Sequence, residues 1–141
     1  MILPGLWGAP VKAISAFAPP MTIEGREVFN DYDEGLAFAR RTGRPVVIDF
    51  TGYGCVNCRK MEAYVLDDDS VKSRLKNYVF IELFVDDKRD GIGDRNSRIQ
   101  REQFGSNAQP FFVQLDSNGH PVGTPIAFTT DPLEFIHWLK Y

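Results

Sequence analysis

The chain's two cysteines, Cys55 and Cys58, stand three positions apart, directly after the apolar run of residues 45–50 and before a stretch with helical character. A strand can carry such a pair to the edge of a sheet. A helix that begins near Cys55 then aims unpaired backbone N–H groups and a partial positive charge at its sulfur. Both effects favour the thiolate, the reactive form of cysteine. Cys58 follows one helical turn later on the same face, so the sequence predicts a dithiol that interconverts with a disulfide.

The two cysteines are expected to have different roles. Cys55 lies at the helix start and should be the more exposed sulfur, so we expect it to be the nucleophile, whereas Cys58 lies a turn deeper and resolves the mixed disulfide. The alternative is an inert cystine. A bridge across so short a loop removes little entropy from the unfolded chain, which makes a purely stabilising role a poor use of it.

Composition excludes several other classes of site. A chain of 141 residues suits one globular domain, and its net charge of -3 with no block of Lys or Arg gives no electrostatic reason to expect nucleic acid. The partner is expected to be a protein or a small thiol. Two cysteines, with His120 and His137 far away, do not make a four-ligand zinc pattern, so no metal is expected. No cofactor is expected beyond the disulfide itself.

The first residues differ from the rest of the chain. Residues 1–20 are apolar, nearly uncharged and interrupted by prolines and glycines, so they match neither a normal signal peptide nor a membrane span. We expect a lead-in over residues 1–22 and one domain over residues 23–141. The lead-in is either a flexible terminus or a juxtamembrane exit segment, and composition does not choose between them.

Alternating strand and helix signals predict an α/β sandwich around a mixed sheet. The expected strands are residues 26–29, 45–50 and 78–85, with a hairpin of residues 111–115 and 121–128 around the turn at 116–119. The expected helices are residues 31–41, 55–66, a piece capped by Asp69 or Ser70 that runs to Lys76, residues 98–104, and a last helix that Asp131 caps. Residues 86–97 read as a polar loop. Leu133, Ile136 and Leu139 recur at helical spacing and are expected to cover one face of the sheet.

This order of elements, with C-x-x-C at a helix start and a later X-Pro strand, resembles the thioredoxin fold over roughly residues 23–141. Residues 47–62, VIDFTGYGCVNCRKME, are similar to the C-terminal periplasmic domain of DsbD-type thiol:disulfide interchange proteins, which are bacterial transmembrane electron carriers. The resemblance implies a central mixed β-sheet flanked by helices. It also implies a periplasmic domain tethered to the inner membrane, with the lead-in as its exit from the membrane.

Two carboxylates stand close to the dithiol in the sequence. Asp49 interrupts an apolar strand, where burial disfavours its charged form, and the resemblance implies a buried acid that accepts and returns protons as Cys58 opens the mixed disulfide. The alternative is an exposed carboxylate at a strand end. Glu62 lies on the helix face of Cys55 and Cys58 and matches a glutamate of the DsbD-type domain. Two carboxylates would disfavour the thiolate and hold the reduced domain unreactive until a partner docks. The alternative for Glu62 is a surface pair with Arg59.

A candidate substrate-binding segment precedes the strand at residues 111–115. From the residues alone the peptide bond before Pro110 is expected to be trans, because only about 5% of X-Pro bonds in folded proteins are cis. The resemblance implies the opposite: a cis Pro110 facing the dithiol, with Gln109 offering backbone hydrogen bonds to an extended substrate. Tyr53 and Phe111 either supply apolar contact beside the sulfur or pack in the core.

The chain departs from thioredoxins at several positions. Gly54 stands where thioredoxins usually carry Trp, and Val56 and Asn57 replace the usual dipeptide between the cysteines. Glu82 stands near the position where thioredoxins place a lysine beside the buried acid. General thioredoxin specificity is therefore not expected to transfer.

The resemblance implies a thiol:disulfide reductase. Reduced Cys55 would attack oxidised periplasmic thioredoxin-like or cytochrome c maturation proteins, and a membrane-embedded donor would reduce the domain again. A disulfide isomerase or oxidant is one alternative, distinguished by its reduction potential. Another is a non-enzymatic interaction module that binds through Tyr53, Gln109 and Phe111. The isolated domain is expected to be a monomer.

Overall fold

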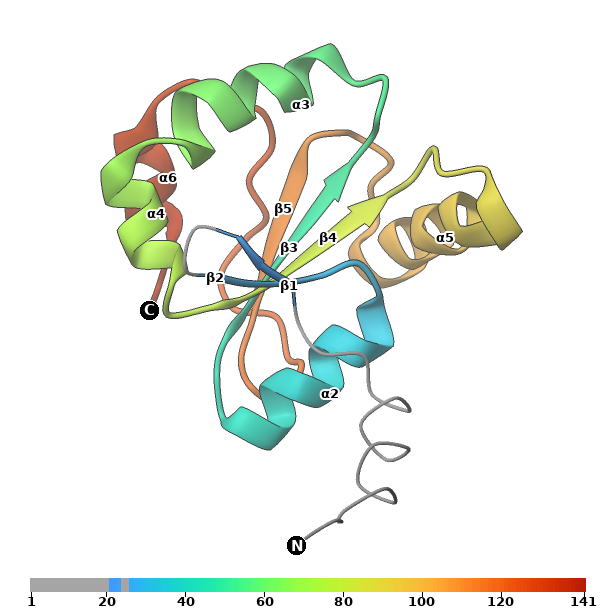
Figure 1. Ribbon diagram of the computed structural model, residues 1–141, viewed down its shortest axis with the longest axis horizontal. Coiled ribbons are helices and arrows are strands. Elements are labelled where there is room, and N and C mark those ends of the chain that lie inside the picture. The colour runs from blue at the N-terminus through green and yellow to red at the C-terminus, as the bar shows by residue number, and fades with distance from the viewer. Residues whose placement is uncertain (1–20, 24–25) are drawn as a thin grey trace, which may run out of the picture.

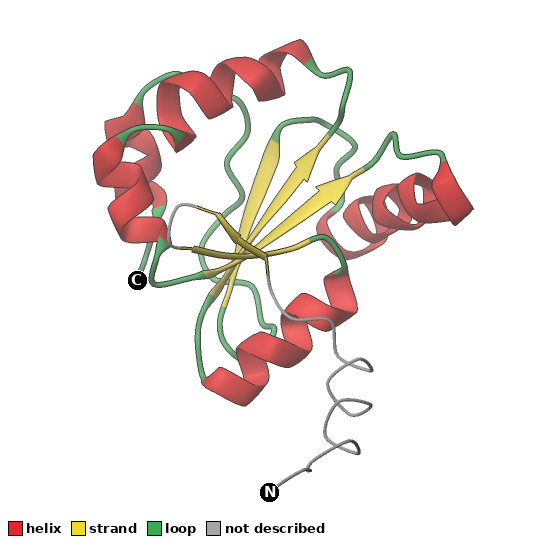
Figure 2. Cartoon of the chain, viewed as in Figure 1, coloured by secondary structure: helices red, strands yellow, loops and turns green. Residues whose placement is uncertain are grey.

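The computed structural model describes residues 21–23 and 26–141. Their centre is one five-stranded sheet with helices on both faces (Figures 1 and 2). The strands, in their order across the sheet, are β1 Met21–Ile23, β2 Arg26–Phe29, β4 Val79–Phe84, β3 Val46–Thr51 and β5 Phe111–Leu115. β2, β4 and β3 run parallel, whereas β1 and β5 pair antiparallel at the two edges. The predicted mixed sheet is therefore confirmed.

The start of the sheet lies close to the predicted domain boundary. β1 begins at Met21, two residues before the expected start of the domain at residue 23. Residues 1–20, which make up most of the predicted lead-in, lie outside the described residues.

Helices cover each face of the sheet with a separate hydrophobic cluster. On one face lie α3 Val56–Met61, α4 Asp69–Leu75 and α6 Pro132–Trp138, and on the other lie α2 Tyr32–Thr42 and α5 Ile92–Phe104 (Figure 1). The π-helical turn η1 Glu62–Leu66 continues α3, and the short 3-10 turn η2 Arg89–Gly91 precedes α5. Alternation along the strands sends Val47 and Phe80 into the first cluster and Ile48 and Ile81 into the second.

The helix ends follow local capping chemistry. Asp31 caps α2 by accepting the Glu34 N–H at 3.0 Å, and Gly43 ends it with φ of 69°, both as predicted. The predicted cap of α4 was wrong. Asp68, and not Asp69 or Ser70, is the extended residue, and its carboxylate accepts the N–H groups of Ser70 and Val71 at 2.9 and 3.3 Å. Three consecutive aspartates are equally suited to capping by residue type, so the sequence could not select among them.

The predicted loop at residues 86–97 is too long, because α5 begins at Ile92 instead of residue 98. The buried face of this helix holds Gly93, Asn96 and Gln100, so it lacks the apolar repeat that signals a helix. A Cβ on Gly93 would stand 2.5 Å from the carbonyl oxygen of Asp87. Glycine therefore permits the close approach of α5 to the end of β4.

The predicted hairpin forms only in part. β5 and the turn after it are present, but the return segment at residues 121–128 forms no continuous strand. It pairs with β5 at the isolated bridges Leu115 to Pro121 and Phe112 to Ile126, and the Val122 N–H donates to the Gln114 carbonyl at 2.9 Å. Between these bridges Gly123 adopts φ of 67° and Pro125 has no N–H to donate. These two residues interrupt the ladder that the hydrophobic pattern suggested.

The buried face at the C-terminal helix matches the predicted one in part, because Leu139 is buried and Ile136 packs against the same cluster. Leu133 is 63% exposed and does not cover the sheet, whereas Phe135 is fully buried. The ring of Phe135 packs edge-on against Phe112 with centroids 5.2 Å apart, and Leu139 lies one turn further along the same face. The helix is rotated so that Phe135, the bulkier side chain, enters the core.

This orientation predicts unequal losses of stability for two substitutions on one helix. Phe135→Ala should lower the free energy of unfolding by about 3–5 kcal/mol, because it leaves a cavity against Phe112. Leu133→Ala should change it by less than about 0.5 kcal/mol, because Leu133 is largely in solvent. Urea unfolding of both variants measures the difference, and a larger loss for Leu133→Ala would contradict the observed orientation.

Candidate functional site

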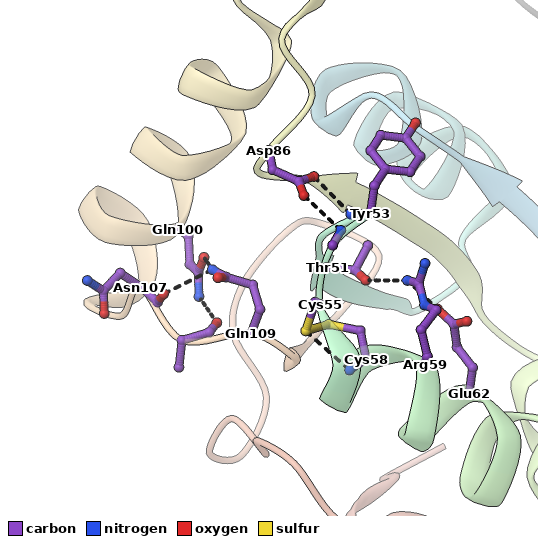
Figure 3. The surroundings of a disulfide bond; sticks show 12 residues. Thr51, Tyr53, Cys55, Cys58, Arg59, Glu62, Asp86, Gln100, Asn107 and Gln109 are labelled. Atoms are coloured by element: carbon purple, nitrogen blue, oxygen red, sulfur yellow. Dashed lines mark hydrogen bonds and ion pairs between the residues drawn. A yellow bond between two sulfur atoms is a disulfide. The ribbon is translucent and has the colours of Figure 1, made fainter.

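The two cysteines form a disulfide at the start of α3 (Figure 3). Their Cα atoms are 5.2 Å apart. Cys55 is the N-cap residue, and its sulfur accepts the Cys58 N–H with a nitrogen to sulfur distance of 3.2 Å. Cys58 is 2% exposed and Cys55 is partly exposed, so solvent and partners reach the first sulfur more readily. This arrangement matches the predicted difference between the two cysteines.

The turn that carries the chain from β3 into Cys55 is held by a carboxylate from β4's end. Asp86 accepts the Tyr53 N–H on one oxygen at 2.9 Å and the Gly54 N–H on the other at 3.1 Å (Figure 3). Burial raises the pKa of Asp86, but these backbone hydrogen bonds and the nearby Arg59 outweigh it, so the net shift is downward. Asp86 therefore stays ionised at neutral pH.

Asp49 is buried beneath the dithiol helix. It is 2% exposed and lies on β3 two residues beyond Val47, whose side chain packs in the cluster that includes Met61 of α3. Because side chains alternate along a strand, Asp49 faces the same side of the sheet as Val47. The exposed alternative for Asp49 is therefore wrong. Glu82 is its direct neighbour in the β3–β4 register, on the same face.

Glu62 is engaged by a cation. Arg59 donates to the Glu62 carboxylate at 2.9 Å and also to the Thr51 hydroxyl at 3.3 Å. Figure 3 shows Glu62 directed toward Arg59 and not toward the disulfide. The surface pair that the sequence left open is thus present, and Glu62 lies where α3 gives way to the π-helical turn.

The segment before β5 lies across the disulfide from Arg59 and Glu62 (Figure 3). The peptide bond between Gln109 and Pro110 is cis, as the resemblance implied and contrary to the expectation from residue statistics alone. Gln100, fully buried on α5, donates to the Ala108 carbonyl at 2.7 Å and accepts from the Gln109 side chain at 2.9 Å. These bonds anchor the segment to α5.

The two candidate aromatic contacts have different surroundings. Tyr53 is 55% exposed and stacks on Phe84 with ring centroids 4.0 Å apart. Phe111 is half-buried and packs against the core beside Phe50, with ring centroids 6.3 Å apart. Tyr53 is thus the more available of the two for contact with a partner.

Sequence reasoning missed two residues that shape this site, Asp86 and Gln100. A usable signal existed for Asp86, because the carboxyl ends of neighbouring parallel strands meet at one sheet edge, and Asp86 follows the strand next to β3. Gln100 gave no comparable signal. It anchors the segment before β5 because it is buried on α5, and the sequence pattern did not predict that part of the helix. Among the described residues, no group of three or more His, Cys, Asp or Glu side chains is placed to hold a metal ion.

Comparison with known proteins agrees with this geometry. A family described as thioredoxin-like matches residues 27–117. The chain is 35% identical over 93 residues to the thiol:disulfide interchange protein DsbD of Ralstonia nicotianae, and 41% identical over 73 residues to DsbD 1 of Pseudomonas aeruginosa. These matches take in 66% and 50% of the chain but only 15% and 12% of the relatives, so the chain spans a small part of their length.

Solved structures show the same fold. A thioredoxin from Thermus thermophilus superimposes with a TM-score of 0.65 at 26% identity, covering 80% of this chain and 83% of that one. The oxidised C-terminal domain of Neisseria meningitidis DsbD gives a TM-score of 0.59 at 20% identity, covering 79% and 95%. The chain therefore belongs to the thioredoxin-like family, as a domain of the DsbD type.

Proposed function

We propose that this domain is a thiol:disulfide oxidoreductase that acts as a reductase. The observation that carries the proposal is the disulfide between a partly exposed Cys55 at a helix start and a buried Cys58. In the reduced protein the Cys58 N–H can hydrogen-bond a Cys55 thiolate, which stabilises the attacking form.

The exchange transfers two electrons to the partner. The Cys55 thiolate attacks one sulfur of a partner disulfide, which forms a mixed disulfide and releases the other partner sulfur as a thiolate. Cys58 loses its proton and attacks the Cys55 sulfur. The Cys55–Cys58 disulfide forms, and the partner leaves with both sulfurs reduced. A dithiol donor then reverses these steps on the domain.

Asp49 is proposed to take the proton of Cys58 in the second step. A carboxylate that is 2% exposed beneath α3 lies on the protein side of the dithiol, where a docked partner does not cover it. Glu62 adds a second negative charge one turn beyond Cys58, partly balanced by Arg59.

The partner is proposed to dock over Tyr53 and along Gln109, Pro110 and Phe111. The exposed Tyr53 ring offers apolar contact, and the backbone of Gln109 is proposed to pair with an extended segment of the partner. Similarity to DsbD supports oxidised periplasmic thioredoxin-like or cytochrome c maturation proteins as partners, and a membrane-embedded domain as electron donor. The same similarity supports a periplasmic domain tethered to the inner membrane. Within the described part of the chain no helix has the length and apolar character needed to cross a bilayer.

Single cysteine substitutions test the two proposed roles. Cys55→Ser should abolish reduction of insulin disulfides by dithiothreitol through the domain, because the attacking sulfur is gone. Cys58→Ser should instead accumulate a stable mixed disulfide with an oxidised peptide, since nothing releases it. Mass spectrometry under non-reducing conditions identifies that adduct. An adduct that forms with Cys55→Ser in place of Cys58→Ser would contradict the assignment.

The role of Asp49 predicts a defect confined to the second step. Asp49→Asn should slow release of the partner from the mixed disulfide by roughly 10²-fold, as expected for loss of a general base. Rapid-quench measurement of the mixed disulfide and the released dithiol separates the two steps. Asp94→Asn, at an exposed position on α5, is the matched control. Release at the wild-type rate from a folded Asp49→Asn protein would rule out the proton transfer.

A further inference from the structure

Asp86 lies outside the C-x-x-C helix, yet it makes two of the hydrogen bonds that hold the turn leading into this helix. Each carboxylate oxygen accepts one backbone N–H, from Tyr53 and from Gly54, the two residues directly before Cys55. A Cβ on Gly52 would stand 3.2 Å from Asp86 Oδ2, so the turn passes close to the carboxylate. The start of the dithiol helix is therefore pinned to the end of β4.

We propose that Asp86 is a positioning residue for the nucleophile, which fixes the turn before Cys55 and whose negative charge holds Cys55 as a thiol in the reduced protein. The inference rests on the proposed function and concerns the regulation of the same site. A reductase that is exposed to solvent avoids side reactions when its free dithiol is mostly protonated. The partner then supplies the surroundings that favour the thiolate.

The charge of Asp86 and the start of the helix have opposite effects on the ionisation of Cys55. The Cys58 N–H and the other free N–H groups of α3 favour a thiolate on Cys55, whereas a carboxylate bound to the adjacent Gly54 disfavours it. Because its two backbone bonds and Arg59 together outweigh the effect of burial on the pKa of Asp86, this carboxylate is ionised wherever the thiol titrates.

The other charged groups around the dithiol are already engaged or lie on another side. Arg59 on α3, the cation that acts on Asp86, is shared with Glu62 at 2.9 Å. Asp49 on β3 is buried beneath the helix, and Glu82 on β4 lies beside it on the same face of the sheet. Arg89 binds the neighbouring Asp87 at 2.7 Å, and the side-chain hydrogen bond between them lowers the pKa of Asp87 to about 2. The loop that holds Gln109 contributes amide groups and no charge.

Asp86→Asn tests the charge with little change of shape. In the fully reduced chain, the thiolate absorbance at 240 nm is titrated against pH, and the rate of Cys55 alkylation by iodoacetamide is measured at pH 7. The substitution should lower the apparent pKa of the Cys55 thiol and raise the alkylation rate by roughly threefold or more. Asp90→Asn removes the same charge from an exposed residue four positions away, at φ of 48° where Asn is also tolerated, and should leave both values unchanged.

A merely structural Asp86 would lower stability without moving the thiol titration. A folded Asp86→Asn protein with wild-type titration and alkylation therefore overturns the inference. If Asp86→Asn does not fold, Asp86→Glu and Asp86→Ser replace it, since both disturb the two-bond contact but differ in charge. The thiol must then titrate at lower pH in Asp86→Ser than in Asp86→Glu, and equal titrations would overturn the inference.

The thiol titration and the alkylation rate are measured without a partner protein. The proposed reductase function and the proposed role of Asp86 can therefore be refuted separately. A wild-type domain that reduces no disulfide refutes the proposed function, while a shifted thiol titration in Asp86→Asn still supports the charge effect. Full reductase activity with an unshifted titration refutes only the role of Asp86.

Discussion

The parallel pairing of β3 with β4 is the constraint on which the site depends. Six residue pairs keep register from Val46 opposite Val79 to Thr51 opposite Phe84, and the Val85 N–H extends the ladder by donating to the Thr51 carbonyl at 2.9 Å. The two strands therefore end at the same edge, where one continues into the turn before Cys55 and the other into Asp86. A shift of one residue would turn Asp49 to the opposite face and separate Asp86 from the turn.

Burial divides the chemistry of this edge into an outer and an inner part. Cys55 and Tyr53 are accessible, whereas Cys58 and Asp49 are each 2% exposed. A partner can thus meet one sulfur while the second sulfur and the acid stay within the protein. Exchange requires this order of events, since the outer cysteine must form the mixed disulfide before the inner one opens it. The carboxylates around the two cysteines disfavour a thiolate on Cys55, whereas the helix start favours it. The reactivity of Cys55 therefore reflects the balance of these two effects.

The sequence was sufficient for features whose signal is local. The C-x-x-C spacing, the apolar strand before it and the caps of α2 predicted the sheet, the dithiol and its burial order. Features that depend on tertiary packing were not predictable in this way. The buried face of α5 is built from Gly93, Asn96 and Gln100, so it carries no apolar period, and the rotation of α6 depends on the fit of Phe135 against Phe112. The cis bond before Pro110 followed only from the resemblance, because residue statistics favour trans.

The central claim is that the dithiol donates electrons, and its reduction potential tests this most directly. The domain is equilibrated with defined ratios of reduced and oxidised dithiothreitol, and the oxidised fraction of Cys55 and Cys58 is measured after acid quenching and alkylation. The account predicts a strongly reducing value, near the figure of about -270 mV for thioredoxin. A value near about -120 mV, typical of a strong oxidant, would contradict it and reassign the domain to disulfide formation.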